Sequence, residues 1–101
     1  MMAEATPRWA FLTNHARALI CIARDPGIRI RDIGRYVGIT ERAAHRIVAE
    51  LLTAGYITRT RDGRRNLYTI NSHMGLPDPL VHHRNVGELL AVVAAAKPNR
   101  P

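Results

Sequence analysis

A three-residue break between two helical patterns, Gly38-Ile39-Thr40, constrains the fold of this chain more than any other feature of its sequence. Before the break, apolar residues recur at the i, i+3, i+4, i+7 spacing of a short amphipathic helix, in Ile30, Ile33, Gly34 and Val37. After it, Thr40 is a good N-cap, no Gly or Pro interrupts the chain as far as Ala54, and Gly55 suits the position just past a helix end. The sequence therefore predicts a short helix and a long helix joined by a tight turn.

One further helix is predicted on each side of this pair. The first has Thr13 or Asn14 as its N-cap, ends at Asp25-Pro26-Gly27, and has an apolar stripe of Ala16, Leu19, Ile20 and Ala23. The last follows a Pro-rich link at 71–79, and its apolar stripe is Val86, Leu89, Leu90 and Val93. Asp78-Pro79 could cap an earlier start of this last helix.

A β-hairpin is predicted between the long helix and the link. Its strands are Tyr56–Arg61 and Arg64–Ile70, because Asp62-Gly63 between them suits a two-residue turn. Closing the loop on that dipeptide sets the cross-strand pairs Arg61 with Arg64, Arg59 with Asn66, and Ile57 with Tyr68. We expect Tyr56 and Tyr68 to be core residues at the base of the hairpin. The fold class is then mainly α with a small β-hairpin, of the α+β type.

The charge of the chain implies an acidic partner. Fifteen Lys and Arg face eight Asp and Glu, which leaves a formal charge of +7 in 101 residues, and all but one of the basic residues are Arg. Arg holds phosphate or guanine in a rigid fork of N–H donors, so nucleic acid fits this composition. A G+C-rich genome also enriches Arg, so composition by itself is no proof.

Other classes of function find little support in the sequence. Cys21 is the only cysteine, which excludes an internal disulfide and a multi-thiolate metal site, and we expect it to be an inert buried thiol. His82-His83 and His73 lack a completing carboxylate or thiolate, so no metal is expected. We also expect no cofactor and no catalysis, since no phosphate loop, acidic pair or activated nucleophile is recognisable. The longest apolar run, Leu89–Ala96, is too short to span a bilayer, so a cytoplasmic location is expected.

The long helix presents a basic face opposite its apolar stripe. The stripe expected in the core is Ala44, Ile47, Val48 and Leu51, and the opposite face is Arg42, His45, Arg46 and Ala49. Small side chains at Ala43 and Ala49 let a helix lie deep in a DNA major groove, which is about 12 Å wide. Arg42 and Arg46 are the candidates for guanine contacts, and Thr40 and His45 could reach bases or phosphates. A plainer interpretation is that Arg42 and Arg46 only solvate the outer face of an amphipathic helix. The neighbouring turn and hairpin make this interpretation less favoured.

The hairpin tip concentrates positive charge. Four arginines lie within seven positions, namely Arg59, Arg61, Arg64 and Arg65. In the predicted register Arg61 faces Arg64, an arrangement that costs stability unless phosphate neutralises both side chains. Protection of a strand edge against aggregation is the alternative role of such charges. Arg8, Arg29, Arg31 and Arg35 could extend the same positive field.

The order of these elements resembles winged helix-turn-helix transcriptional regulators of the MarR and ArsR type. The resemblance covers Asn14 to Ile70 and is most specific in Asp32–Thr40 and Leu51–Ile57. It implies base-contact positions at Thr40, Glu41, Arg42, Ala43, His45 and Arg46. It also implies a wing on the DNA backbone, with contacts from Arg59, Arg61, Arg64 and Arg65. Arg31 is a further candidate for a backbone contact. Metal sensing is not implied, because the ArsR-like motif needs paired cysteines.

The chain is expected to divide into four parts. These are an N-terminal arm (1–12), a winged helix-turn-helix domain (13–70), a linker with a C-terminal dimerisation helix (71–96) and a disordered tail (97–101). Apolar residues outside the domain exceed what one small domain covers, so we expect a homodimer interface. It would contain Trp9, Phe11, Leu12, Val86, Leu89, Leu90 and Val93.

The sequence thus predicts a regulator that binds specific double-stranded DNA. Helix 40–54 would read the major groove and wing 59–65 would contact phosphates. One alternative is a winged-helix module that binds protein instead of DNA. Another is a protein that binds double-stranded RNA or binds generally to the nucleoid. No small-molecule effector is identified by the sequence.

Overall fold

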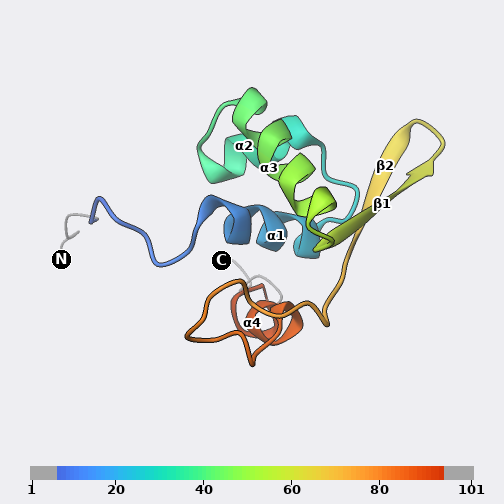
Figure 1. The fold of residues 1–101 in the computed structure, drawn as a ribbon. Helices are drawn as coiled ribbons and strands as arrows, with labels where there is room; N and C mark the ends of the chain where they lie inside the picture. The colour runs from blue at the N-terminus through green and yellow to red at the C-terminus, as the bar shows by residue number, and fades with distance from the viewer. Residues whose placement is uncertain (1–6, 95–101) are drawn as a thin grey trace, which may run out of the picture.

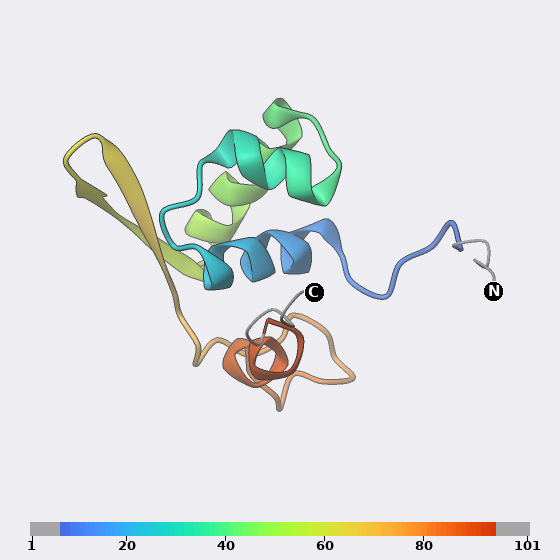
Figure 2. The ribbon, with the colours of Figure 1, turned by 180° about the vertical axis from the view of Figure 1, so that it is seen from behind.

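The protein forms four helices and one hairpin, in a computed structural model that describes residues 7–94. The elements are α1 (Asn14–Arg24), α2 (Ile30–Val37), α3 (Glu41–Thr53), β1 (Ile57–Asp62), β2 (Arg65–Ile70) and α4 (Val86–Val93). Helix α1 lies in the middle, with α2 and α3 on one side of it and α4 on the other (Figures 1 and 2). The mainly α fold with a β-hairpin wing is confirmed. The predicted tail at 97–101 and the first six residues of the arm lie outside the described residues.

The turn between α2 and α3 is built on Gly38. This residue has the left-handed backbone angle φ of +85°, and its N–H donates to the carbonyl oxygen of Gly34 at 2.8 Å. The N–H of Ile39 donates to the same oxygen at 2.9 Å. The Thr40 hydroxyl then accepts from the N–H of Ala43 at 3.0 Å and begins α3 as its N-cap. The positions of Gly38 past the end of α2 and of Thr40 as N-cap are confirmed.

One aliphatic core joins the helices to the hairpin. The predicted stripe of α3 is confirmed, because Ala44, Ile47, Val48 and Leu51 are all buried. In α1 the prediction was partly wrong: the buried residues are Ala18, Leu19 and Ile22. Ala23 is exposed, whereas Ala16 and Ile20 are half-buried. Contacts of α1 with α2, α3, β2 and α4 decide which of its faces is covered, and apolar spacing within one helix does not contain that information.

The register of the hairpin differs from the predicted one. The strands pair Ile57 with Ile70, Arg59 with Tyr68, Arg61 with Asn66, and Asp62 with Arg65. The loop is therefore Gly63-Arg64, and Gly63 is left-handed at φ +65° whereas no non-glycine residue among 7–94 has a positive φ. A glycine in the first loop position suits a type II′ turn, while the prediction assumed a glycine in the second. Arg61 does not face Arg64, so the like-charge argument for a phosphate partner is withdrawn.

The last helix begins at Val86 and not near Pro79. Asn85 caps it through a capping box, in which Asn85 Oδ1 accepts from the N–H of Glu88 at 2.8 Å and Glu88 Oε1 accepts from the N–H of Asn85 at 3.0 Å. Tyr56 is half-buried, and its hydroxyl donates to the carbonyl oxygen of Gly75 at 2.9 Å, which ties the link to the hairpin base. Val86 is 2% exposed, so it is a core residue of its own chain and not the dimer contact that we predicted.

None of the helices among residues 7–94 combines the length and the apolar character that crossing a bilayer needs.

Replacing Gly38 with Ala tests the turn. Because no atom lies within 4 Å of the position that a Cβ would take, the substitution introduces backbone strain alone. We expect it to lower the free energy of unfolding by about 1–2 kcal/mol. Gly38→Asn should cost less, since Asn tolerates left-handed angles better than Ala does. Urea unfolding followed by circular dichroism measures both, and an Ala variant as stable as the parent would contradict this account of the turn.

Candidate nucleic-acid interface

The outer face of α3 carries the residues predicted to contact bases. Arg42, His45 and Arg46 are exposed, and Ala43 is half-buried. His45 Nε2 lies 3.6 Å from a carboxylate oxygen of Glu41, one turn earlier. The Thr40 oxygen accepts the capping bond with one lone pair, so its hydroxyl hydrogen and its second lone pair remain for a partner. The face is therefore basic in its N-terminal half.

A basic hollow of about 440 Å³ connects this helix to the wing. Its lining includes Arg29, Arg31, Glu41, His45, Arg64 and Arg65. The start of α2, the start of α3 and the loop of the hairpin thus contribute to one concave surface. Arg42, Arg46, Arg59 and Arg61 are exposed outside the hollow, on α3 and β1. Figure 1 shows the hairpin projecting beyond the helices, and α4 lies across α1 from α2 and α3.

Arg65 has a structural contact that the sequence did not reveal. Its Nη2 donates to the carbonyl oxygen of Gly27, in the loop between α1 and α2, at 3.2 Å. The same loop contacts β2 through its backbone, since the N–H of Tyr68 donates to the carbonyl oxygen of Pro26 at 2.9 Å. A Cβ on Gly27 would lie 2.1 Å from Arg65 Nη2, so a larger residue here would displace the arginine side chain. Arg65 fixes the wing to the helical part of the domain.

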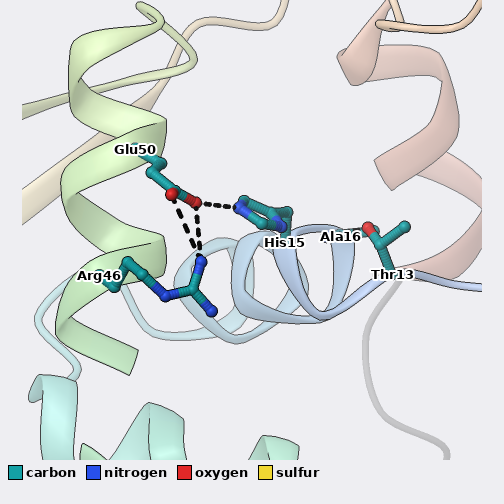
Figure 3. Close-up of polar contacts among 5 residues, drawn as sticks. All are labelled: Thr13, His15, Ala16, Arg46 and Glu50. Carbon is teal, nitrogen blue, oxygen red and sulfur yellow. Dashed lines mark hydrogen bonds and ion pairs between the residues drawn. The ribbon is translucent and has the colours of Figure 1, made fainter. Parts of the chain in front are cut away.

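Arg46 belongs to a charged cluster of three residues that joins α1 to α3 (Figure 3). Its Nη1 donates to both carboxylate oxygens of Glu50, at 3.3 Å each. His15 of α1 contacts the same carboxylate, with 2.6 Å between its Nε2 and Glu50 Oε1. The hydrogen bond from His15 is the main cause that lowers the pKa of Glu50, and the positive charge of Arg46 acts in the same direction.

His15 and Glu50 were missed by the sequence analysis. The i, i+4 spacing of Arg46 and Glu50 was visible and could have indicated their ion pair. No sequence signal indicated His15, which is 35 positions away from its partner.

A second hollow, of about 610 Å³, is mainly apolar and is lined by residues of the arm, of α1 and of the C-terminal end of α2. Ile20, Cys21 and Val37 line it together with Phe11 and Leu12 of the arm. Cys21 is half-buried, and burial raises the pKa of its thiol while Arg24 and Arg17 lower it less. We predicted a buried thiol, whereas the Cys21 side chain is only half-buried and lines this hollow.

The residues predicted for a dimer interface do not form one surface in the single chain. The arm extends away from the helices (Figures 1 and 2), where Trp9 is 63% and Phe11 91% exposed. Their rings contact each other edge to face, with 5.0 Å between centroids. Leu89, Leu90 and Val93 of α4 are half-buried, as is Leu12. Apolar surface is thus available both on the arm and on α4.

His73, His82 and His83 were considered as metal ligands in the sequence analysis, and no metal was expected there. The rings of His82 and His83 are 6.2 Å apart, and no group of three potential metal ligands comes together within the described part of the chain.

Comparison with known proteins identifies relatives of this fold. A solved structure, the PcaV transcriptional regulator from Streptomyces coelicolor in complex with its natural ligand, is similar with a TM-score of 0.52 and 25% sequence identity. The similarity covers 79% of this chain but 55% of the PcaV chain, so this chain spans little more than half of that regulator's length. Comparison with curated proteins gives no match.

The family model described as the MarR family matches residues 11–65, which is more than half of the 101 residues. The matched range runs from the arm to the second strand and includes α2, the Gly38 turn and α3. The chain therefore belongs to the MarR family of winged-helix transcriptional regulators.

Proposed function

We propose that this protein is a cytoplasmic regulator that binds specific sequences in double-stranded DNA through α3 and the wing. The observation that carries the proposal is the basic hollow, in which residues of α3 and of the wing line one surface. An anionic duplex laid against that surface meets both elements at once. Within residues 7–94, α4 packs on the other side of α1 and leaves this surface uncovered.

Base contacts are assigned to the exposed N-terminal half of α3. Arg42 and Arg46 can each hold guanine O6 and N7 with two N–H donors. The Glu41 carboxylate can accept from cytosine N4, although in the free chain it lies beside His45. Thr40 and His45 complete the set, and the small side chain of Ala43 allows close approach. Phosphate contacts are assigned to Arg31, Arg59, Arg61, Arg64 and the donors of Arg65 that Gly27 does not use.

The active form is proposed to be a homodimer. Exposed aromatic rings on the arm and exposed apolar side chains on α4, including Val92 at 79%, are surfaces that a partner copy can cover. From the predicted set we retain Trp9, Phe11, Leu12, Leu89, Leu90 and Val93, and we leave out the buried Val86. Two-fold symmetry would then require two similar half-sites in the DNA.

A protein-binding module is the second candidate, and the charge of the surface makes it the weaker one. Such a module would present an apolar or acidic face at α3, whereas this face has Arg42, His45 and Arg46 exposed. Binding to double-stranded RNA is disfavoured because a protein helix does not enter the deep, narrow major groove of RNA.

Substitution in α3 tests base recognition. Arg42→Ala should weaken binding to the preferred site by about 1–3 kcal/mol and relax the preference at one base pair, because a two-donor contact to guanine is lost. Fluorescence anisotropy with preferred and scrambled duplexes at one salt concentration measures the change. Equal losses on both duplexes would argue against base recognition by this residue.

Substitution in the wing should behave differently. Arg61→Ala and Arg64→Ala should each weaken binding to every duplex alike and reduce the slope of log K against log salt by about one unit, since one phosphate contact is lost. Arg84→Ala is the matched control, because Arg84 precedes α4, away from the wing, and pairs with Glu88. A control that changes the salt slope as much as the wing variants do would contradict the assignment.

The dimer is tested on α4. Val92 is 79% exposed, so Val92→Glu should leave the fold intact while placing a charge in the proposed interface. We expect sedimentation equilibrium to show dimers of the parent at micromolar concentration and mostly monomers of the variant. A parent that remains monomeric at that concentration would remove the dimer from the proposal.

A further inference from the structure

The carboxylate of Glu50 lies between a side chain of α3 that is proposed to contact DNA and a side chain of α1. Arg46 reaches it from one turn earlier on α3, and His15 reaches it from the first turn of α1 (Figure 3). All three side chains are 43–61% exposed, with Arg46 the most exposed at 61%. The cluster therefore lies on the surface and keeps its arginine accessible to a partner.

The contribution of this cluster to the stability of the fold is small. Exposed ion pairs on a helix add little to the free energy of unfolding, because solvent screens the charges and the side chains lose freedom. A carboxylate beside a DNA-binding face also repels phosphate, so it weakens binding by simple electrostatics. A useful role must come from what the carboxylate does to Arg46.

The contacts determine which donors of Arg46 remain free. Nη1 is directed to both oxygens of Glu50, and no other hydrogen bond of the Arg46 guanidinium occurs among residues 7–94. In a guanidinium group, Nε and Nη2 each point one N–H bond in the same direction, along the edge that does not include Nη1. Two parallel donors on that edge are enough for guanine O6 and N7.

We propose that Glu50 and His15 are positioning residues that hold Arg46 with its Nε and Nη2 edge free for a guanine. This inference rests on the proposed DNA binding of α3. An unrestrained arginine loses rotamer freedom when it binds, whereas one that is already held loses less, so its contact contributes more to affinity. His15 fixes the carboxylate from a second helix, which limits the motion of Glu50 itself.

The decisive variant is Glu50→Gln, because electrostatics and positioning predict opposite results for it. The preferred site is first obtained by selection from random DNA with the unmodified chain, and affinities are measured by anisotropy at fixed salt. Removal of a negative charge alone tightens binding to all DNA. Loss of positioning should instead weaken binding to the preferred site roughly 5- to 20-fold, the lower part of the range for a lost two-donor contact, and leave scrambled DNA within about 2-fold.

Two further variants separate positioning from folding. In an Arg46→Ala background, Glu50→Gln should cause no additional loss at the preferred site, since its effect passes through Arg46. His15→Ala should weaken binding in the same direction as Glu50→Gln, and His15→Gln should restore it, because the amide N–H can still donate to the carboxylate.

The matched control is Glu88→Gln. It makes the same chemical change in another i, i+4 ion pair, with Arg84 at 3.3 Å, and Gln keeps the oxygen that the capping box needs. We expect it to leave the preference between preferred and scrambled DNA unchanged.

The inference is overturned if Glu50→Gln binds the preferred site as tightly as the parent or more tightly, with unchanged base preference. Glu50 would then be a bystander or a competitor of DNA for Arg46, and the proposed DNA binding would stand. A parent chain without preference for any sequence would instead overturn the proposed function together with this inference.

Discussion

The direction of α3 relative to α2 depends on the left-handed turn at Gly38. Two successive N–H groups, of Gly38 and Ile39, donate to one carbonyl oxygen at the last turn of α2, and Thr40 then begins α3 by capping it. The turn allows α3 to bury Ala44, Ile47, Val48 and Leu51 while its opposite face remains exposed. The exposure of Arg42, His45 and Arg46 follows from this packing.

A second constraint places the wing beside that exposed face. Arg65 and Tyr68 of β2 both donate to carbonyl oxygens of the loop between α1 and α2, at Gly27 and Pro26. Strand β2 is therefore held, at its first residue and at Tyr68, by the same helical unit that orients α3. Its loop arginine, Arg64, and the start of α3 line one hollow as a result. The proposed DNA surface is a consequence of two sets of short contacts, neither of which involves the exposed arginines of α3.

Local features were predictable from the sequence, and features that depend on distant contacts were not. Gly38, Thr40 and the α3 stripe were identified because turn, cap and apolar spacing all act within a few residues. The buried face of α1 was partly misassigned, since α4 and β2 also contact this helix and the spacing within α1 does not show where they pack. The hairpin register was wrong because a glycine can take either position of a two-residue loop, the second in the type I′ turn that we assumed and the first in a type II′ turn.

The candidate site shows the same division. The exposed basic face of α3 was predicted residue by residue, because a helix whose buried stripe is known leaves its opposite face to solvent. The contacts of Glu50 with His15 and of Arg65 with Gly27 were not predicted, since these partners come from distant parts of the sequence. Such contacts change what an arginine can offer to DNA, so a motif alone does not define its role.

Selection of DNA fragments from a random pool by the unmodified full chain tests the central claim most directly. The account predicts enrichment of one pseudo-palindromic sequence, with two half-sites about 10 base pairs apart or a multiple of that spacing. Recovery of fragments without any shared sequence, at a salt concentration where the chain still binds, would contradict it.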